Sequence, residues 1–150
     1  MRRQQGFSYL IVMFLVATLT LASVRALQIT LVNEQREREA ELLLTGMAYR
    51  NAIRSYYFNL SGTAKELPKD MDVLLADGRG QRKVPHLRKR FRDPMTTGAW
   101  EEIKDDDGFL VGVVSRSGKA PIKKDGFPPE LAHFVQAQTY RDWKFIFKPE

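Results

Sequence analysis

The chain carries no charged residue between Phe7 and Val24, and this run (FSYLIVMFLVATLTLASV) constrains its fold more than any other feature. As an α-helix, a segment of this length extends about 27 Å, close to the roughly 30 Å thickness of the hydrocarbon core of a bilayer. We therefore expect residues 7–24 to form a membrane-spanning helix.

The charges on either side of this run predict its orientation. Arg2 and Arg3 precede it, whereas the basic residues beyond Arg25 are matched by glutamates. Because unmatched basic residues stay on the cytoplasmic side, we expect a cytoplasmic amino terminus and a single pass, with the bulk of the chain outside. The rival interpretation is a cleaved secretory signal, which would have a shorter apolar region and a small-residue cut site.

The helical pattern continues well past the apolar run. No proline occurs between Met1 and Pro68, so the sequence predicts one helix over residues 7–59. Residues 33–39 are polar on every face, which is typical of a segment that is solvated or packed against other chains. Further on, apolar residues spaced three and four apart predict a stripe that packs on a sheet. The stripe consists of Leu42, Tyr49, Ile53 and Tyr57, with Gly46 between them.

Glycine and proline then divide the chain into short elements, which predict an α+β head over residues 60–150. Its sheet should have three or four antiparallel strands and should pack on the carboxyl half of the long helix. The expected elements are a helix over 67–76 capped by Asp70, a hairpin of strands 99–104 and 109–115, a helix over 130–138 and a strand over 143–147. The aromatic residues expected to supply much of the core are Trp100, Phe109, Trp143, Phe145 and Phe147.

The sequence offers little that could carry catalysis. Cysteine is absent, and neither His86 nor His133 has a serine or carboxylate at the spacing of a known motif. The acidic residues 105–107 could hold calcium, but they lack the alternating ligands of a known loop, and a solvated hairpin turn is the favoured interpretation. We predict no enzyme activity, no metal site and no cofactor.

One block of charge stands out in a chain of net charge +6. Residues 79–92 include seven basic residues and no acidic one, and clustered cations favour contact with an acidic subunit, anionic lipid or nucleic acid. A solvated loop is the alternative to a subunit contact, and nucleic acid is the weakest of these interpretations because aromatic residues for base stacking are few. The residues assigned to a possible partner contact are Arg82, Lys83, Arg88, Lys89, Arg90 and Arg92.

The amino terminus resembles the class III signal of type IV pilins and type II secretion pseudopilins. Residues 2–5 form a short basic leader, Gly6 and Phe7 follow, and the apolar run begins there. The resemblance covers residues 2–60. It implies that residues 1–6 are a leader, that a prepilin peptidase cuts between Gly6 and Phe7, and that the new terminal amine of Phe7 is methylated.

The resemblance also implies a function in assembly. The chain would be a minor pilin or pseudopilin of a type II secretion or type IV pilus machine, with a pilin-like fold. It would be inserted in the inner membrane, with its head in the periplasm. Its partners would be other subunits, the prepilin peptidase, the inner-membrane assembly platform and the lipid bilayer. The residues that would pack in the fibre core include Phe7, Tyr9, Leu10, Ile11 and Phe14.

Ile11 departs from the family pattern. Most members carry a glutamate at this place, five residues after the cut. In lacking it, the chain resembles a minority of minor subunits that are assigned to a fibre tip or an initiation complex. Two other functions stay open from the sequence: a DNA-binding minor pilin for uptake, and a periplasmic enzyme held by a signal anchor.

Overall fold

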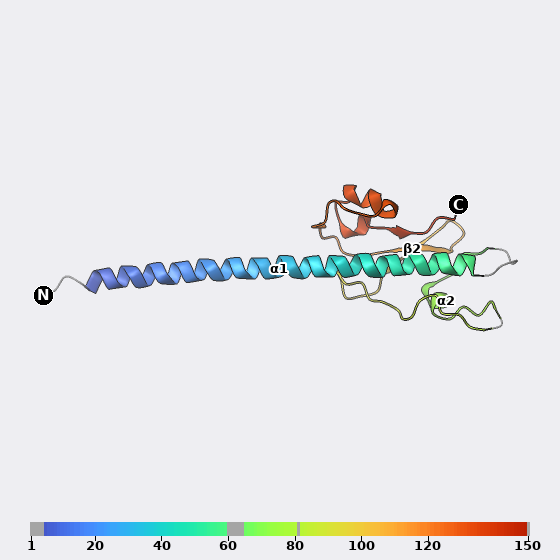
Figure 1. The fold of residues 1–150 in the computed structure, drawn as a ribbon, viewed down its shortest axis with the longest axis horizontal. Coiled ribbons are helices and arrows are strands. Elements are labelled where there is room, and N and C mark those ends of the chain that lie inside the picture. Colours follow the sequence, from blue (N-terminus) through green and yellow to red (C-terminus); the bar gives the residue numbers. More distant parts are fainter. Residues whose placement is uncertain (1–4, 60–64, 81, 150) are drawn as a thin grey trace. The chain divides into compact units, whose positions relative to one another are not determined.

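The computed structural model describes residues 5–59, 65–80 and 82–149 of the 150-residue chain. Helix α1 runs over Gln5–Phe58, which confirms the predicted long helix to within two residues at each end. The chain forms two compact units, Met1–Glu37 and Arg38–Glu150. The first contains the amino-terminal part of α1, and the second, here called the head, contains the rest of α1 and all other elements (Figure 1).

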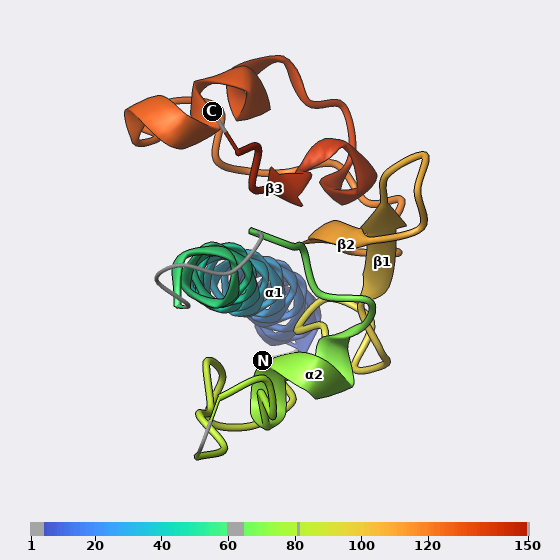
Figure 2. The same cartoon turned by 90° about the vertical axis from the view of Figure 1, so that its right-hand side faces the viewer.

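The head has an α+β architecture, as predicted. Three antiparallel strands form a sheet in the order β1-β2-β3, from Glu101–Lys104, Leu110–Val114 and Phe145–Ile146. Within the head, the sheet lies on one side of α1, and helix α2 (Met71–Leu75) lies on the other (Figure 2). Two 3₁₀ helices, η1 (Pro129–Gln136) and η2 (Tyr140–Asp142), precede β3.

Helix α2 is shorter than the ten residues predicted from the sequence. Asp70 caps it as expected, because its Oδ1 accepts hydrogen bonds from the backbone N–H groups of Asp72 and Val73 at 3.0 and 3.1 Å. The preceding backbone is extended, and the carbonyl of Pro68 accepts a hydrogen bond from the N–H of Leu110 at the start of β2. Tertiary pairing with the sheet therefore replaces the first turn of the predicted helix.

The β1–β2 hairpin forms where the sequence predicts it. Its turn depends on Asp105, whose Oδ1 accepts hydrogen bonds from the N–H groups of Asp107 and Phe109. Gly108 adopts a φ of +82°, a left-handed conformation that favours glycine. The acidic turn thus has a structural explanation in hydrogen bonding.

The last two predicted elements differ from the structure. The predicted helix over 130–138 is a 3₁₀ helix, and the expected strand over 143–147 shortens to Phe145–Ile146. Trp143 ends η2, and the carbonyl of Lys144 accepts a hydrogen bond from the N–H of Ile146, so a tight turn occupies the first half of the expected strand.

Four of the five aromatic residues predicted for the core are buried. Trp143 and Phe145 are fully buried, and Trp100 and Phe147 are at most 6% exposed. Phe109 was predicted wrongly: it is only half-buried, and its neighbour Leu110 is fully buried instead. The hydrogen bond from Leu110 to the segment before α2 explains the difference, because it directs β2 inward from its first residue.

The apolar stripe of α1 forms the centre of this core. Leu42, Tyr49 and Ile53 are fully buried, and Tyr57 is half-buried. The hydroxyl of Tyr49 donates to the carbonyl of Phe91 and accepts from its N–H, both at 3.0 Å. Each fully buried side chain of this size contributes about 1.5–3 kcal/mol to folding.

Glu39 contradicts the prediction that residues 33–39 are solvated or packed against other chains. The residue is only 4% exposed, and it lies within the head. The carboxylate accepts hydrogen bonds from the N–H groups of Ile122 and Lys123 at 3.0 and 3.1 Å, and from the hydroxyl of Tyr140 at 3.3 Å. Glu39 therefore anchors the long segment between β2 and η1 to α1.

Candidate functional site

The surface of the amino-terminal part of α1 is apolar and uncovered. The side chains predicted to pack in an assembly are all exposed, at 69% for Phe7, 64% for Tyr9, 65% for Leu10, 46% for Ile11 and 72% for Phe14. Monomeric soluble proteins rarely expose a contiguous apolar surface of this extent, and such surfaces are typical of membrane or protein contacts.

Three hydroxyl side chains in the second half of this segment bond to carbonyls of their own helix. The hydroxyl of Thr18 donates to the carbonyl of Leu15 at 2.9 Å, and those of Thr20 and Ser23 donate to carbonyls four residues earlier at 2.8 and 2.9 Å. A hydroxyl that is already bonded to its own helix costs less to place in an apolar medium. The segment is thus compatible with hydrocarbon despite its serine and threonine residues, a feature that the hydropathy of the sequence does not reveal.

Helix α1 is long and apolar enough to cross a membrane, and its most apolar window is not buried by the rest of the chain. The predicted processing site, Gly6 and Phe7, lies within the first turn of this helix. Leader residues 1–4, including Arg2 and Arg3, lie outside the described residues.

The basic segment 79–92 does not form one uniform surface. Arg90 pairs with Asp72 at 3.2 Å, and the ammonium group of Lys89 lies 5.4 Å from the ring centre of Phe91. Arg79 belongs to a separate polar cluster. The other members of the predicted contact, Arg82, Lys83, Arg88 and Arg92, are exposed like Lys89 and Arg90.

Backbone bonds hold this basic segment in a defined path. Asp77 and Val84 exchange two hydrogen bonds of 3.0 Å, which form an antiparallel bridge between these two residues. The N–H groups of His86 and Leu87 both donate to the carbonyl of Leu74 at the end of α2. The backbone of the basic segment is therefore tied to Asp77 and to the end of α2.

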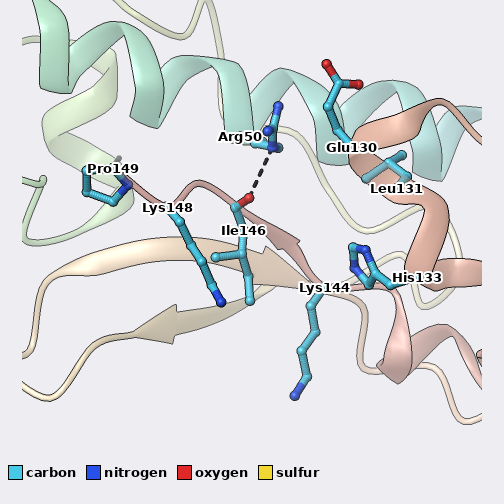
Figure 3. A pocket seen from close by; sticks show the side chains of 8 residues that line it. All are labelled: Arg50, Glu130, Leu131, His133, Lys144, Ile146, Lys148 and Pro149. Atoms are coloured by element: carbon cyan, nitrogen blue, oxygen red, sulfur yellow. Dashed lines mark hydrogen bonds between the residues drawn. The ribbon is translucent and has the colours of Figure 1, made fainter.

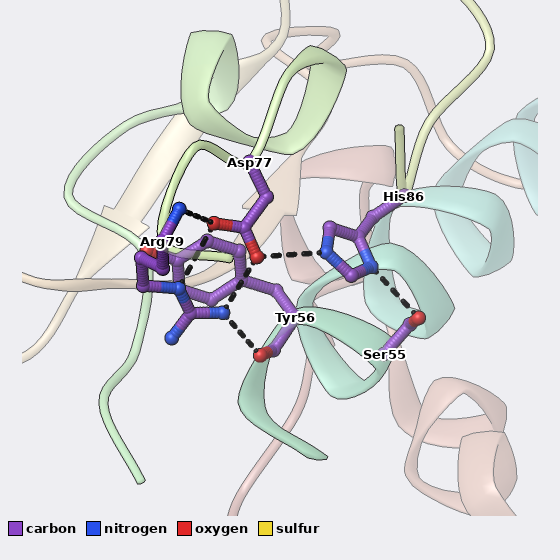
Figure 4. Close-up of polar contacts among 5 residues, drawn as sticks. All are labelled: Ser55, Tyr56, Asp77, Arg79 and His86. Atoms are coloured by element: carbon purple, nitrogen blue, oxygen red, sulfur yellow. Dashed lines mark hydrogen bonds and ion pairs between the residues drawn. The ribbon is translucent and has the colours of Figure 1, made fainter. Parts of the chain in front are cut away.

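A polar cluster ties the basic segment to the end of α1 (Figure 4). It consists of the side chains of Ser55, Asp77, Arg79 and His86. The side chains of Asp77 and His86 are almost fully buried, and Asp77 Oδ2 lies 3.1 Å from Nε2 of His86. His86 Nδ1 lies 2.8 Å from the hydroxyl of Ser55 on α1. Because a carboxylate only accepts, Nε2 donates to Asp77, and Nδ1 shares a hydrogen bond with the hydroxyl of Ser55.

Arg79 completes the cluster. Its Nε and Nη2 donate to the two carboxylate oxygens of Asp77 at 3.0 and 2.9 Å, and Nη2 also donates to the carbonyl of Tyr56. Its guanidinium carbon lies 3.4 Å from the ring centre of Tyr56. Hydrogen bonds from Arg79 are the main reason that the pKa of Asp77 lies well below its usual value.

The chain Ser55–His86–Asp77 has the residue types of a hydrolase triad, which the sequence did not bring together. Its surroundings favour a structural role. Both carboxylate oxygens of Asp77 accept hydrogen bonds from Arg79, so Asp77 forms an ion pair with Arg79 in addition to its contact with His86. Ser55 lies in the last turn of α1, where backbone N–H groups bond to carbonyls four residues earlier and cannot form an oxyanion hole.

The second histidine lies on η1, which is not part of this cluster. His133 is exposed on η1, and its ring contacts that of Phe134 with centres 4.6 Å apart. Among the described residues, no three histidine, aspartate or glutamate side chains lie close enough together to hold a metal ion.

A scan against models of known protein families finds no match to this chain, and comparisons with curated proteins and with solved structures find none either.

Proposed function

We propose that this chain is a minor pilin or pseudopilin of a type II secretion or type IV pilus machine, and that it acts by assembly and not by catalysis. The observation that carries the proposal is the uninterrupted helix α1, whose first part exposes an uncharged apolar surface and whose last part forms the core of a small α+β head. A subunit of this design can be stored in a bilayer and later packed side by side with other helices.

A bilayer and a fibre both require an uninterrupted helix with an apolar surface. In a bilayer every backbone polar group must be satisfied within the segment, and a helix meets this condition. In a fibre the apolar side chains around Phe7 and Phe14 would pack against those of neighbouring subunits. The partners would be the bilayer, the prepilin peptidase, the inner-membrane assembly platform and other subunits.

The proposed topology follows from the flanking charges. The amino terminus lies in the cytoplasm, where the peptidase cuts between Gly6 and Phe7, and the head lies in the periplasm. The exposed cations of residues 79–92 would then face periplasmic partners, with an acidic neighbouring subunit as the first candidate.

Mass spectrometry of the mature amino terminus tests the proposal. We expect the mature chain to begin with N-methylated Phe7 when it is produced with a prepilin peptidase. A Gly6→Leu variant should keep residues 1–6, because the peptidase of this family requires a small residue before the cut. Recovery of an intact Met1 terminus from the unchanged chain would contradict the proposal.

The polar cluster bears on the alternative of an anchored enzyme. Ser55 could serve as a nucleophile only if His86 acted as its base, and Arg79 already neutralises the carboxylate behind that base. The second alternative, DNA uptake, predicts DNA affinity that falls steeply with salt and after charge removal at Arg88 to Arg92.

A further inference from the structure

The head carries a second cationic surface, away from the basic segment in the sequence. A groove of about 710 Å³ lies between α1, η1 and β3. Arg50 on α1 faces Ile146 on β3, and Lys144 and Lys148 lie on either side of Ile146 (Figure 3). These residues come from distant parts of the chain, which explains why no local charge run reveals them.

Arg50 is fixed in this groove. Its Nε donates to the carbonyl of Ile146 at 3.0 Å, on the edge of β3 that does not pair with β2. The two terminal amino groups of its guanidinium make no other hydrogen bond within the described part of the chain. A guanidinium held in this way is preorganised to bind a carboxylate through its outer nitrogens.

The cationic surface continues along α1. A second depression of about 250 Å³ shares Arg50 and Lys148 with the groove and adds Arg54, one helical turn after Arg50. Phe58, which is 52% exposed, lies in the same depression. Cationic and apolar groups therefore alternate along one face of the head.

Internal acids offset this charge only in part. Hydrogen bonds from Thr139 lower the pKa of Asp142, and the charge of Lys144 contributes to this shift, so Lys144 already has an acidic neighbour. Glu130 lines the groove next to His133. In contrast, Arg54 and Lys148 are exposed and form no ion pair with a described residue.

We propose that Arg50, Arg54 and Lys148 form a docking surface for an acidic segment of a partner protein, which binds them through its carboxylates. Apolar side chains of the same segment pack on Ile146 and Phe58. This contact lies on the head and does not depend on assembly through the amino-terminal part of α1.

Two features favour a polypeptide over other anions. Glu130 at the side of the groove repels a uniform polyanion such as nucleic acid, whereas a peptide can place a neutral or basic side chain there. The buried side chain of Leu131 and the half-buried side chain of Ile146 give the groove an apolar floor. Apolar floors with arginine beside them are typical of protein interfaces.

A binding experiment on the full chain in non-ionic detergent micelles tests this surface. The probe is a fluorescein-labelled peptide of alternating glutamate and leucine, followed by anisotropy and corrected against protein-free micelles. The test variant is Arg54→Gln/Lys148→Gln, which leaves the hydrogen bond of Arg50 intact. The control Arg88→Gln/Lys89→Gln removes one arginine and one lysine from the basic segment and changes the net charge equally.

We expect the test variant to bind the peptide at least tenfold more weakly, which corresponds to about 1.4 kcal/mol, and the control to stay within about twofold. Arg50→Lys should also weaken binding, because lysine keeps the charge but loses the fork of donors. No binding by the unchanged chain, or an equal loss in both double variants, would overturn the proposal. Stronger displacement of the peptide by single-stranded DNA or by phosphatidylglycerol than by unlabelled peptide would overturn it as well.

Discussion

Gly46 on α1 lies directly against the ring of Phe145 on β3. A Cβ atom at position 46 would be only 2.5 Å from Cδ2 and Cζ of that ring, which is far closer than carbon atoms approach in proteins. Phe145 is itself fully buried and lies edge-to-face with Trp100 and Phe134. The missing side chain of Gly46 thus sets the distance at which the sheet packs on the helix.

This contact reverses the usual effect of glycine in a helix. Replacing a glycine inside a helix with alanine stabilises it by about 1 kcal/mol when there is room for the methyl group. We expect Gly46→Ala to destabilise the head by about 1–3 kcal/mol instead, because the ring of Phe145 has to move. Tryptophan fluorescence during unfolding measures the effect in the full chain in detergent, since both tryptophans are buried in the head.

The matched control is Gly118→Ala, where no atom of the described residues, apart from the two chain neighbours, lies within 4 Å of the added Cβ. Its unfolding free energy should change by less than about 0.5 kcal/mol. A stabilising Gly46→Ala variant would mean that helix and sheet do not pack as described.

Phe145→Ala should cost about 3–5 kcal/mol, because it leaves a large cavity among Trp100, Phe134 and Gly46. The same unfolding measurement checks this value. Val135→Ala, at a side chain that is 49% exposed on η1, is the comparison and should cost little. A loss below about 1 kcal/mol for Phe145→Ala would show that its ring is not part of the core.

These contacts also show which parts of the head the sequence could predict. The β1–β2 hairpin was predictable because its turn is local: Asp105 and Gly108 lie between the two strands and direct the chain back. The core stripe of α1 was predictable because the helical repeat places Leu42, Tyr49 and Ile53 on one face. In contrast, alternation over residues 143–147 could not reveal that η2 extends to the start of the expected strand.

The polar contacts were beyond the reach of sequence patterns. No feature of the sequence distinguishes Glu39 from Glu37 and Glu41. It becomes a buried anchor because the backbone N–H of Lys123, 84 residues later, donates to its carboxylate. Ser55 and His86 are 31 residues apart and meet only because the loop after α2 returns to α1. Neither pair follows a helical or strand repeat, so no local signal identifies it.

The ionised carboxylate of Asp77 should make stability depend on acid. Hydrogen bonds from Arg79 are the largest cause of its lowered pKa. Because the folded pKa lies below the unfolded value of about 4, the contribution is fully present above that pH and is lost as the pH falls below it toward the folded pKa. Asp77→Asn should lower the unfolding free energy at neutral pH by about 1.5–3 kcal/mol. It should also make the unfolding free energy depend less on pH in the acid range.

Unfolding free energies between neutral pH and acid, compared with Asp72→Asn, check this prediction. Asp72 pairs with Arg90 in solvent, and its side chain is 70% exposed, so that substitution should cost less than about 1 kcal/mol. If the unfolding free energy of Asp77→Asn fell with acid as steeply as that of the unchanged chain, the assigned role of Asp77 would be contradicted.

Thr97 has a φ of +59°, an unfavourable conformation for a β-branched residue. Its N–H donates to the carbonyl of Asp93 at 2.7 Å, which holds the turn between α2 and β1 in this conformation. We expect Thr97→Gly to stabilise the head by about 0.5–1 kcal/mol, since relief of strain exceeds the added entropy of the unfolded chain. Ala99→Gly, at a residue of ordinary φ, should destabilise it, and equal losses in both variants would contradict the strain at Thr97.

Ile11 distinguishes the proposed function from that of an ordinary fibre subunit. A carboxylate at this depth in a bilayer costs about 2.5–3.5 kcal/mol unless it is paired. It is therefore useful only to a subunit that can pair it with the terminal amine of the subunit assembled just before. Ile11 is apolar and carries no such cost. If the leader is removed as proposed, the new terminal amine of Phe7 can still receive the glutamate of the next subunit, which suits the first position in a fibre.

We therefore expect the protein to be scarce, to lie at a tip or in an initiation complex with other minor subunits, and to form no fibres alone. Epitope labelling of assembled fibres, with the tag on the exposed acidic turn at Asp106, measures its position. Label confined to one end is the expected result, and label along the whole shaft would refute the tip placement. An Ile11→Glu variant provides the control: if the missing carboxylate restricts the subunit to the first position, restoring it should allow label to enter the shaft.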